Sequence, residues 1–278
     1  MVTRRLSLDT IERLRAHRWR TAPARQVSDQ RGALRLVREL GFALLMPIAG
    51  AELPNIHQAT SKTWAWWDWK QTLPGRKACY YAKVIRRRGT FISWDWFPCF
   101  HAVYADPRPY HEHYRDGLLE RDEKLVLDII AERGPLMTSE LRLAFGPRSK
   151  ANTRRVKSIL VDLQTRFLVT AAGGDTAGWS HHRWDLVARW APPASLAEAA
   201  RLSPEEARLR LVRQFVRIMV ATTEADIAWT FGWERPEVRR SLARLQELGE
   251  IAPAWVPELE CQVLAPVGLA CGRAGAGR

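Results

Sequence analysis

Residues 149–167 read SKANTRRVKSILVDLQTRF, and residues 234–250 read ERPEVRRSLARLQELGE. In each stretch apolar residues recur every three or four positions, which predicts a helix with one buried face. The apolar positions are Val156, Ile159, Leu160, Leu163 and Phe167 in the first stretch, and Val238, Leu242, Leu245 and Leu248 in the second. Both stretches also carry an arginine pair, Arg154-Arg155 or Arg239-Arg240. The sequence therefore contains a duplicated basic helix.

The segments around these two helices are duplicated as well. Each basic helix is preceded by a longer helix and a short helix, and is followed by β-prone residues. The first copy comprises residues 121–134, 138–145 and 168–187, and the second comprises 203–219, 222–232 and 251–256. A winged helix-turn-helix has this order of elements: a helix, a short helix, a third helix and a hairpin. In that fold the third helix enters the major groove of DNA.

This repeat organises the predicted domains. We expect a mainly α-helical fold with small β elements and tandem winged helix-turn-helix domains. The expected boundaries are a tryptophan-rich, winged-helix-like domain over residues 1–115, winged-helix domains over 119–195 and 203–257, and a flexible tail over 258–278. The tail ends in LACGRAGAGR, a composition that cannot build a core.

The charge balance points to a polyanionic partner. The 278 residues include 43 Lys and Arg against 30 Asp and Glu, a formal net charge of +13 with a pI near 10.2. Such an excess predicts nucleic acid as the partner, here double-stranded DNA. A solvated basic surface without a partner is the alternative. No apolar run approaches the roughly 20 residues that a membrane-spanning helix needs, so we expect a cytoplasmic, nucleoid-associated monomer.

Cysteine spacing argues against a metal or redox site. Cys79, Cys99, Cys261 and Cys271 lie far apart, so we expect free thiols, with Cys79 and Cys99 buried. We expect no metal and no cofactor.

Cationic side chains of the two basic helices are the predicted DNA-binding residues. Arginine and lysine neutralise phosphates or pair with guanine, and asparagine pairs with adenine. The candidates are Lys150, Asn152, Arg154, Arg155 and Lys157 in the first copy, and Arg235, Arg239, Arg240 and Arg244 in the second. His181, His182 and Arg183 in the first hairpin are expected to reach phosphate.

The N-terminal region combines an apolar run with many tryptophans. Residues 41–54 read GFALLMPIAGAELP, and six of the chain's 13 tryptophans follow within residues 64–96. They are Trp64, Trp66, Trp67, Trp69, Trp94 and Trp96. Aromatic side chains stack on a base that an enzyme has rotated out of the duplex. The alternative for each of them is packing in the core or between domains.

The order of these features resembles a known family. Leu40-Gly41-Phe42 through Pro54, then YYAKVIRRRGTFIS, then two winged helices, resembles the AlkZ/YcaQ-like bacterial DNA glycosylases over roughly residues 6–257. The resemblance implies tandem winged helices, a role in DNA repair, and hydrolysis of the N-glycosidic bond of alkylated or crosslinked purines. It also implies a terminal β-barrel, for which too few residues remain after Val256.

The family's catalytic signature is not present. That signature, Gln-x-Gln or Gln-x-Asp shortly after a Leu-Gly pair, falls here on Leu44 and Met46. Neither side chain positions water or stabilises a developing cation. We therefore interpret GFALLMP as a buried strand-like segment.

Two carboxylates are the remaining catalytic candidates. Glu52 lies close to the apolar run, and Asp95 stands between Trp94 and Trp96. An acid in an aromatic setting can have a raised pKa and act on a base or a water. Each could equally cap a helix or pair with a cation, and His57 and Gln58 are weaker candidates.

Three functions remain open from the sequence. The first is a DNA N-glycosylase that uses substitute carboxylates. The second is a non-catalytic DNA-binding protein, either a lesion sensor or a transcriptional regulator. The third is a structural adaptor with weak affinity for DNA.

Overall fold

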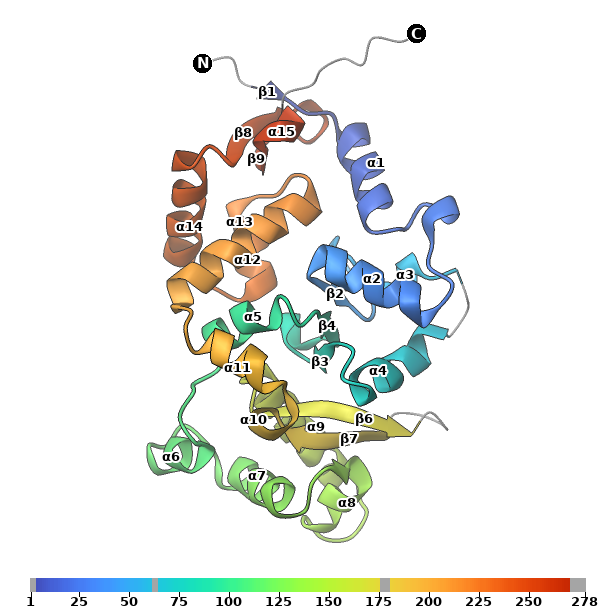
Figure 1. The fold of residues 1–278 in the computed structure, drawn as a ribbon, viewed down its shortest axis with the longest axis vertical. Coiled ribbons are helices and arrows are strands. Elements are labelled where there is room, and N and C mark those ends of the chain that lie inside the picture. The colour runs from blue at the N-terminus through green and yellow to red at the C-terminus, as the bar shows by residue number, and fades with distance from the viewer. Residues whose placement is uncertain (1–3, 62–64, 176–180, 271–278) are drawn as a thin grey trace.

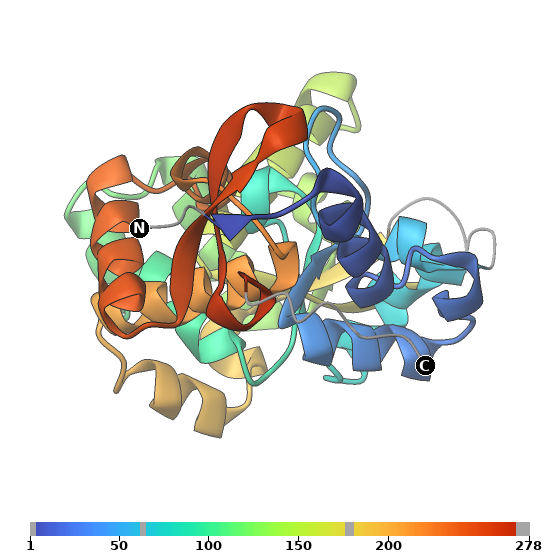
Figure 2. The same ribbon diagram turned by 90° about the horizontal axis from the view of Figure 1, so that it is seen from above.

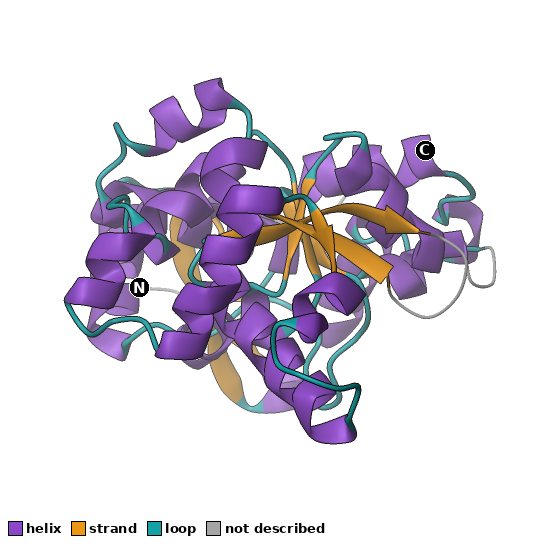
Figure 3. Ribbon diagram, turned by 90° about the horizontal axis from the view of Figure 1, so that it is seen from below, coloured by secondary structure: helices purple, strands orange, loops and turns teal. Residues whose placement is uncertain are grey.

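The computed structural model of the chain describes residues 4–61, 65–175 and 181–270 (Figure 1). Helices dominate, and the strands of these residues form three small three-stranded sheets. Seen from below, the strands cross the middle of the molecule with helices around them (Figure 3). The predicted class, mainly α with small β elements, is confirmed.

The second module, residues 121–186, has the predicted order. Its elements are α7 (Arg121–Arg133), β5 (Leu136–Met137), α8 (Thr138–Leu143), α9 (Lys150–Thr165), β6 (Val169–Asp175) and β7 (His181–Leu186). Strand β7 pairs antiparallel with both β5 and β6. Ser149 caps α9, because its hydroxyl accepts a hydrogen bond from the backbone of Asn152 at 3.0 Å. Order and pairing are consistent with a winged helix-turn-helix.

The third module, residues 204–266, repeats this order. Its elements are α12 (Pro204–Met219), α13 (Glu224–Phe231), α14 (Arg235–Glu247), β8 (Ile251–Val256) and β9 (Cys261–Pro266). A single bridge between Thr222 and Leu264 replaces the short first strand. Ser203 caps α12 ahead of Pro204, since its hydroxyl accepts from the Glu206 backbone N–H at 3.1 Å.

The predicted flexible tail is wrong over residues 261–270. Strand β9 pairs with β8 from Cys261 to Pro266, and α15 (Val267–Ala270) follows it. Val263 and Ala265, two positions apart on β9, both lie on the buried face of this hairpin. They give the segment the apolar contacts that its composition did not predict. Residues 271–278, including Cys271, lie outside the described residues.

The first module, residues 30–92, has the same order of elements. It comprises α2 (Gln30–Leu40), β2 (Phe42–Leu44), α3 (Ile56–Ala59), α4 (Ala65–Gly75), β3 (Tyr80–Ala82) and β4 (Thr90–Ile92). Its last strand lies centrally, in the order β2-β4-β3, as β7 does in the second module. The predicted buried strand is confirmed, because Phe42, Ala43 and Leu44 are each at most 1% exposed.

Short elements connect the modules. They are α5 (Phe97–Tyr104), α6 (Tyr110–Arg115), α10 (Val187–Trp190) and α11 (Pro193–Ala199). Of the 3-10 turns, η1 (Pro23–Arg25) precedes the first module, η2 (Ile85–Arg87) lies between β3 and β4, and η3 (Pro257–Leu259) lies between β8 and β9. The domain boundaries stay a prediction, because one buried apolar cluster extends through all three modules. Cys79 and Cys99 are buried free thiols, as predicted.

The N-terminal segment belongs spatially to the third module. Strand β1 (Arg4–Arg5) pairs in parallel with β8, as Figure 2 shows from above. Helix α1 (Leu8–Arg18) is held by Arg15, whose guanidinium donates to the carbonyls of Met219 at 2.8 Å and Ala221 at 2.9 Å.

Helix α4, the third helix of the first module, packs on strand β6 of the second. The two backbones touch where Gly75 meets Gly173, whose φ is +107°. Trp66 and Trp69 of α4 are buried, which favours the packing interpretation for these two tryptophans. Trp64 lies outside the described residues. Helix α4 is therefore part of an internal contact.

Replacing Gly173 by alanine should destabilise the protein more than replacing Gly232. An added Cβ at Gly173 would lie 2.9 Å from the Gly75 Cα, whereas at Gly232, where φ is +71°, it would meet no atom within 4 Å. We expect Gly232→Ala to cost about 1 kcal/mol and Gly173→Ala about 3 kcal/mol. Urea denaturation measures both losses, and equal losses would contradict the close backbone contact.

Candidate nucleic-acid interface

Helix α9 presents exposed cations at its N-terminal end. Lys150, Arg154 and Lys157 are exposed, while Val156 and Leu160 on the opposite face are buried. Beside the first turn lies a hollow of about 480 Å³ lined by Arg142, Arg148, Ser149, Lys150, Thr153 and Arg154. A helix N-terminus surrounded by cations favours an anion such as a phosphate.

Two candidates on α9 already have partners in the protein. The Asn152 side-chain amide donates to the carbonyls of Phe145 at 2.7 Å and Pro147 at 2.9 Å, so its nitrogen holds the turn between α8 and α9. Arg155 pairs with Asp122 of α7, and its guanidinium lies 5.2 Å from the centre of the Phe145 ring. Arg154 is better placed than Arg155 to meet a phosphate.

A second cationic element lies next to α9. It is the connection between β3 and β4, residues 83–89, here called the basic wing. Arg86, Arg87 and Arg88 are exposed, and φ is positive at Arg86 and Arg87. These residues were not predicted from the sequence as DNA-binding candidates. The available signal was three consecutive arginines followed by Gly89 between two β-prone segments.

Contacts fix the basic wing against α9. The Lys83 backbone N–H donates to the Gln164 side-chain oxygen at 3.0 Å, and Arg87 pairs with Asp162 at 2.6 Å. Burial lowers the pKa of Lys83, and the nearby charges of Arg88, Lys157 and Arg87 lower it further. Since Lys157 belongs to α9 and Arg88 to the wing, cations of the two elements lie near one another.

The other side of the basic wing touches the third module. The Arg86 guanidinium lies 4.8 Å from the centre of the Trp229 ring on α13, and Trp229 is itself 39% exposed. Cation–π contact holds the arginine without cancelling its charge. The wing of the first module thus lies between α9 and α13.

In the hairpin of the second module, His182 lies beside aromatic side chains. Its Nδ1 is buried without a hydrogen-bond partner among the described residues, and its ring lies beside Tyr81 and Trp184. Burial, followed by the charges of Lys70 and Lys83, lowers the pKa of His182 to about 3. A neutral imidazole carries no charge to neutralise a phosphate, and contact of His182 with DNA stays a prediction. Arg183 is exposed, and the side chain of His181 lies outside the described residues.

The predicted cations of α14 are exposed but separate from those of α9. Arg235 and Arg240 face solvent, whereas Arg239 pairs with Glu224 at 2.9 Å and Arg244 with Glu247 at 3.1 Å. Figure 1 shows α14 and α9 at different heights along the long axis, with α12 and α5 between them. The two arginine pairs do not meet in one patch.

The family's catalytic positions lie at the base of the basic wing. The Leu45 backbone N–H donates to the Gly89 carbonyl at 2.7 Å, which places this segment beside the wing. The Leu44 side chain is buried in the sheet, and Met46 is 40% exposed. Gly41 ends α2 with a φ of +85°, and Trp96 covers it so closely that a Cβ would lie 2.8 Å from the indole ring.

Neither candidate carboxylate has the buried aromatic surroundings expected for it. Glu52 is 71% exposed, pairs with Arg15, and lies at a cleft of about 670 Å³ that Asp226 and Trp229 also line. Asp95 is exposed in a turn, because Trp94 bends inward and donates to the Lys77 carbonyl at 2.7 Å.

The two weaker candidates also have local contacts. His57 packs edge-on against Trp66 with ring centres 5.0 Å apart, and Gln58 accepts from the Asn55 amide at 2.5 Å. Across residues 4–61, 65–175 and 181–270, no cluster of three His, Cys, Asp or Glu side chains could hold a metal. No helix in the described part of the chain is long and apolar enough to cross a membrane.

Comparison with known proteins agrees with this architecture. The structure is similar to that of the Streptomyces sahachiroi DNA glycosylase AlkZ, with a TM-score of 0.62 and 14% sequence identity, covering 96% of this chain and 72% of that one. At this identity the similarity shows the fold. A family model described as AlkZ related matches residues 27–232, so the chain belongs to the AlkZ-related family. A sequence search of curated proteins finds no match.

Burial of His182 should make stability fall in acid. Its pKa is lowered from 6.5 to about 3, so below pH 6.5 the unfolded chain gains a proton that the folded protein does not. The free energy of unfolding should then decrease from pH 6.5 towards pH 3, by at most ~1.4 kcal/mol per pH unit for this group.

His182→Phe should reduce that slope in chemical denaturation measured across the same pH range. His111→Phe is the control, because the side chain of His111 is exposed and its loss should leave the slope unchanged. An equal slope in His182→Phe and the unmodified protein would show that His182 is not protected from protonation.

Proposed function

We propose that this protein binds duplex DNA in DNA repair, through α9 and the basic wing. The observation that carries the proposal is that the basic wing is fixed against α9, where the Lys83 backbone N–H donates to the Gln164 side chain at 3.0 Å. Arg88 of the wing and Arg154 and Lys157 of α9 all remain exposed. Like charges are costly to hold together without a polyanion to neutralise them. A phosphate backbone supplies that neutralisation and releases its own counterions.

The binding should depend little on base sequence. Lysine and arginine contacts to phosphate position a protein on DNA but do not read bases. Asn152, the candidate adenine reader, uses its amide nitrogen within the turn before α9. This arrangement favours a repair protein, associated with the nucleoid, over a transcriptional regulator that must select one site.

Helix α14 would contact a separate stretch of DNA. Arg235 and Arg240 are the exposed cations of that helix without an ion pair among the described residues, and Arg183 is the corresponding cation of the second module's hairpin. These contacts would extend the footprint along the duplex. The primary surface remains α9 with the basic wing.

The protein should bind DNA without excising a base at the family's catalytic position. An apolar Leu44 and a thioether at Met46 can neither activate water nor stabilise a positive charge on the sugar. A second candidate, a glycosylase that uses Glu52, has one observation in its favour, because Glu52 lies at a cleft that Trp229 also lines. Against it, Glu52 is 71% exposed and its carboxylate is paired with Arg15, so it lacks the buried setting typical of a catalytic acid.

Removing Arg88 and Arg154 together should weaken DNA binding and flatten its salt dependence. Each lost phosphate contact lowers the slope of log affinity against log salt by about 0.9, so the double variant should lose roughly 2 from the slope. Fluorescence anisotropy with random-sequence duplexes over a range of salt concentrations measures both quantities.

The matched control is Arg13→Ala with Arg201→Ala, which removes the same charge from exposed positions outside α9 and the wing. An equal change in the two double variants would point to net charge alone. An unchanged slope in Arg88→Ala with Arg154→Ala would reject this surface.

Duplex DNA that carries N7-alkylated guanine should be bound but not hydrolysed. With protein at stoichiometric concentration, we expect no free base by chromatography while anisotropy shows a complex. Base release that is lost in Glu52→Gln, with DNA binding retained, would replace this proposal by the glycosylase. The variant Asp95→Asn tests the other carboxylate in the same way.

A further inference from the structure

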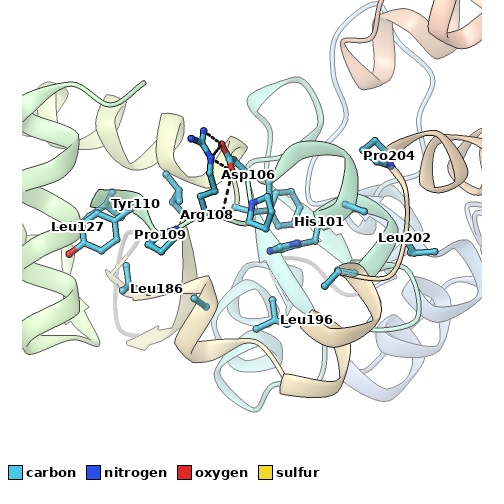
Figure 4. A pocket seen from close by; sticks show the side chains of 18 of the residues that line it. His101, Asp106, Arg108, Pro109, Tyr110, Leu127, Leu186, Leu196, Leu202 and Pro204 are labelled. Carbon is cyan, nitrogen blue, oxygen red and sulfur yellow. Dashed lines mark hydrogen bonds and ion pairs between the residues drawn. The ribbon is translucent and has the colours of Figure 1, made fainter. Parts of the chain in front are cut away.

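A pocket lies where α5 meets the chain that joins the modules. Its volume is about 760 Å³, within the usual range for small-molecule sites. The walls include Ala102 of α5, Leu127 of α7, Leu186 of β7 and Leu196 of α11 (Figure 4). None of the exposed cations of α9 or of the basic wing lines this pocket.

The pocket exists because small side chains face it. Five alanines from three segments line the space, namely Ala102, Ala105, Ala188, Ala199 and Ala200. Larger residues at these positions would fill the volume that the alanines leave open. Leu196, Leu202 and Phe167 make the remaining wall mostly apolar. Such a surface favours an apolar ligand, because burying it releases water from both partners.

Arg108 at the pocket is already paired with two carboxylates. Arg108 donates from Nε to Asp106 at 3.0 Å and from Nη1 to Asp116 at 2.6 Å, and Figure 4 marks its pairing with Asp106. Hydrogen bonding from Arg108 lowers the pKa of Asp106 to about 2, so the pair stays ionised. An anionic ligand would find no free cation here and would lose its hydration.

One polar group at the pocket has no hydrogen-bond partner among residues 4–61, 65–175 and 181–270. His101 packs its ring against Phe97 and Phe167, with ring centres 5.4 and 5.7 Å apart. Within the described residues its imidazole makes ring contacts but no hydrogen bond. Burial lowers its pKa to about 4, so a neutral imidazole faces the space with one donor and one acceptor. Figure 4 shows this ring among the lining residues, between Asp106 and Leu196.

We propose that this pocket binds a neutral aromatic small molecule that carries one hydrogen-bonding group for His101. The aromatic rings of the ligand pack against the alanine and leucine side chains of the walls, and Phe167 and His101 supply aromatic contacts. The paired Arg108 offers no free cation to an anionic ligand. The ligand contacts α5, the second module and the start of α12, and therefore bridges the second and third modules.

Two fluorescent probes test whether a negative charge on the ligand weakens its binding to the pocket. N-phenylnaphthylamine is neutral and has one N–H donor, and anilinonaphthalene sulfonate adds a negative charge to the same ring system. Titration of the full chain should show saturable binding of the neutral probe at one site. The sulfonate should bind at least about tenfold more weakly, because no free cation compensates its desolvation. Equal affinity for both probes, or no saturable binding, overturns the proposal.

Variants of one helix end locate the site. Ala200 is exposed and lines the pocket, so Ala200→Phe places an aromatic ring in the space that the probe would occupy. The affinity for the neutral probe should fall by about tenfold or more. Ala197→Phe adds the same ring to the same helix outside the lining and should leave the affinity unchanged. His101→Phe keeps the ring but removes the acceptor, and should weaken binding by roughly threefold to tenfold.

Circular dichroism and duplex-DNA affinity check that each variant is folded. Loss of probe affinity in Ala197→Phe equal to that in Ala200→Phe places the probe elsewhere and rejects the pocket. Since the probe titration contains no DNA, its result is independent of the DNA-binding proposal.

Discussion

The contact on which the architecture depends is the aromatic packing on both sides of the first module's sheet. Phe42 of β2 meets Phe215 and Phe231 of the third module with ring centres 6.5 and 5.9 Å apart. Tyr80 of β3 stacks on Phe167 of the second module at 5.2 Å. The sheet of the first module therefore contacts both the second and the third module. These contacts fix the three modules in one arrangement and join their cores.

This arrangement gives equivalent elements different roles. Helix α4 occupies the third-helix position of the first module, yet it is buried against β6, with Lys70 and Gln71 each 3% exposed. Helix α9 occupies the same position in the second module and keeps a cationic face in solvent. The basic wing of the first module lies beside α9 and adds the charge that α4 cannot present. The proposed DNA surface is thus built from unlike parts of two similar modules.

The sequence predicted what depends on local periodicity. The stripe of α9 and the buried run at Phe42 were predicted correctly, because helical spacing and apolar runs report directly on burial. The stripe of α14 was predicted correctly except at Leu248, which follows the helix and is 46% exposed. The helix at residues 65–75 was not predicted, since it is buried around most of its surface and shows no apolar stripe. Strand β9 and the role of Arg86 to Arg88 depend on partners distant in sequence. The candidate site could be predicted on α9 but not on the basic wing.

The pairing of β1 with β8 joins residues separated by almost the whole chain, with Arg4 opposite Ala254. During synthesis, the first residues emerge long before the strand that they accompany has been made. Closing so large a loop costs conformational entropy, and the contacts that offset this cost form only when the third module has folded. The sheet that receives β1 is therefore completed late in folding, and the nascent N-terminal segment must wait for the last module before it docks.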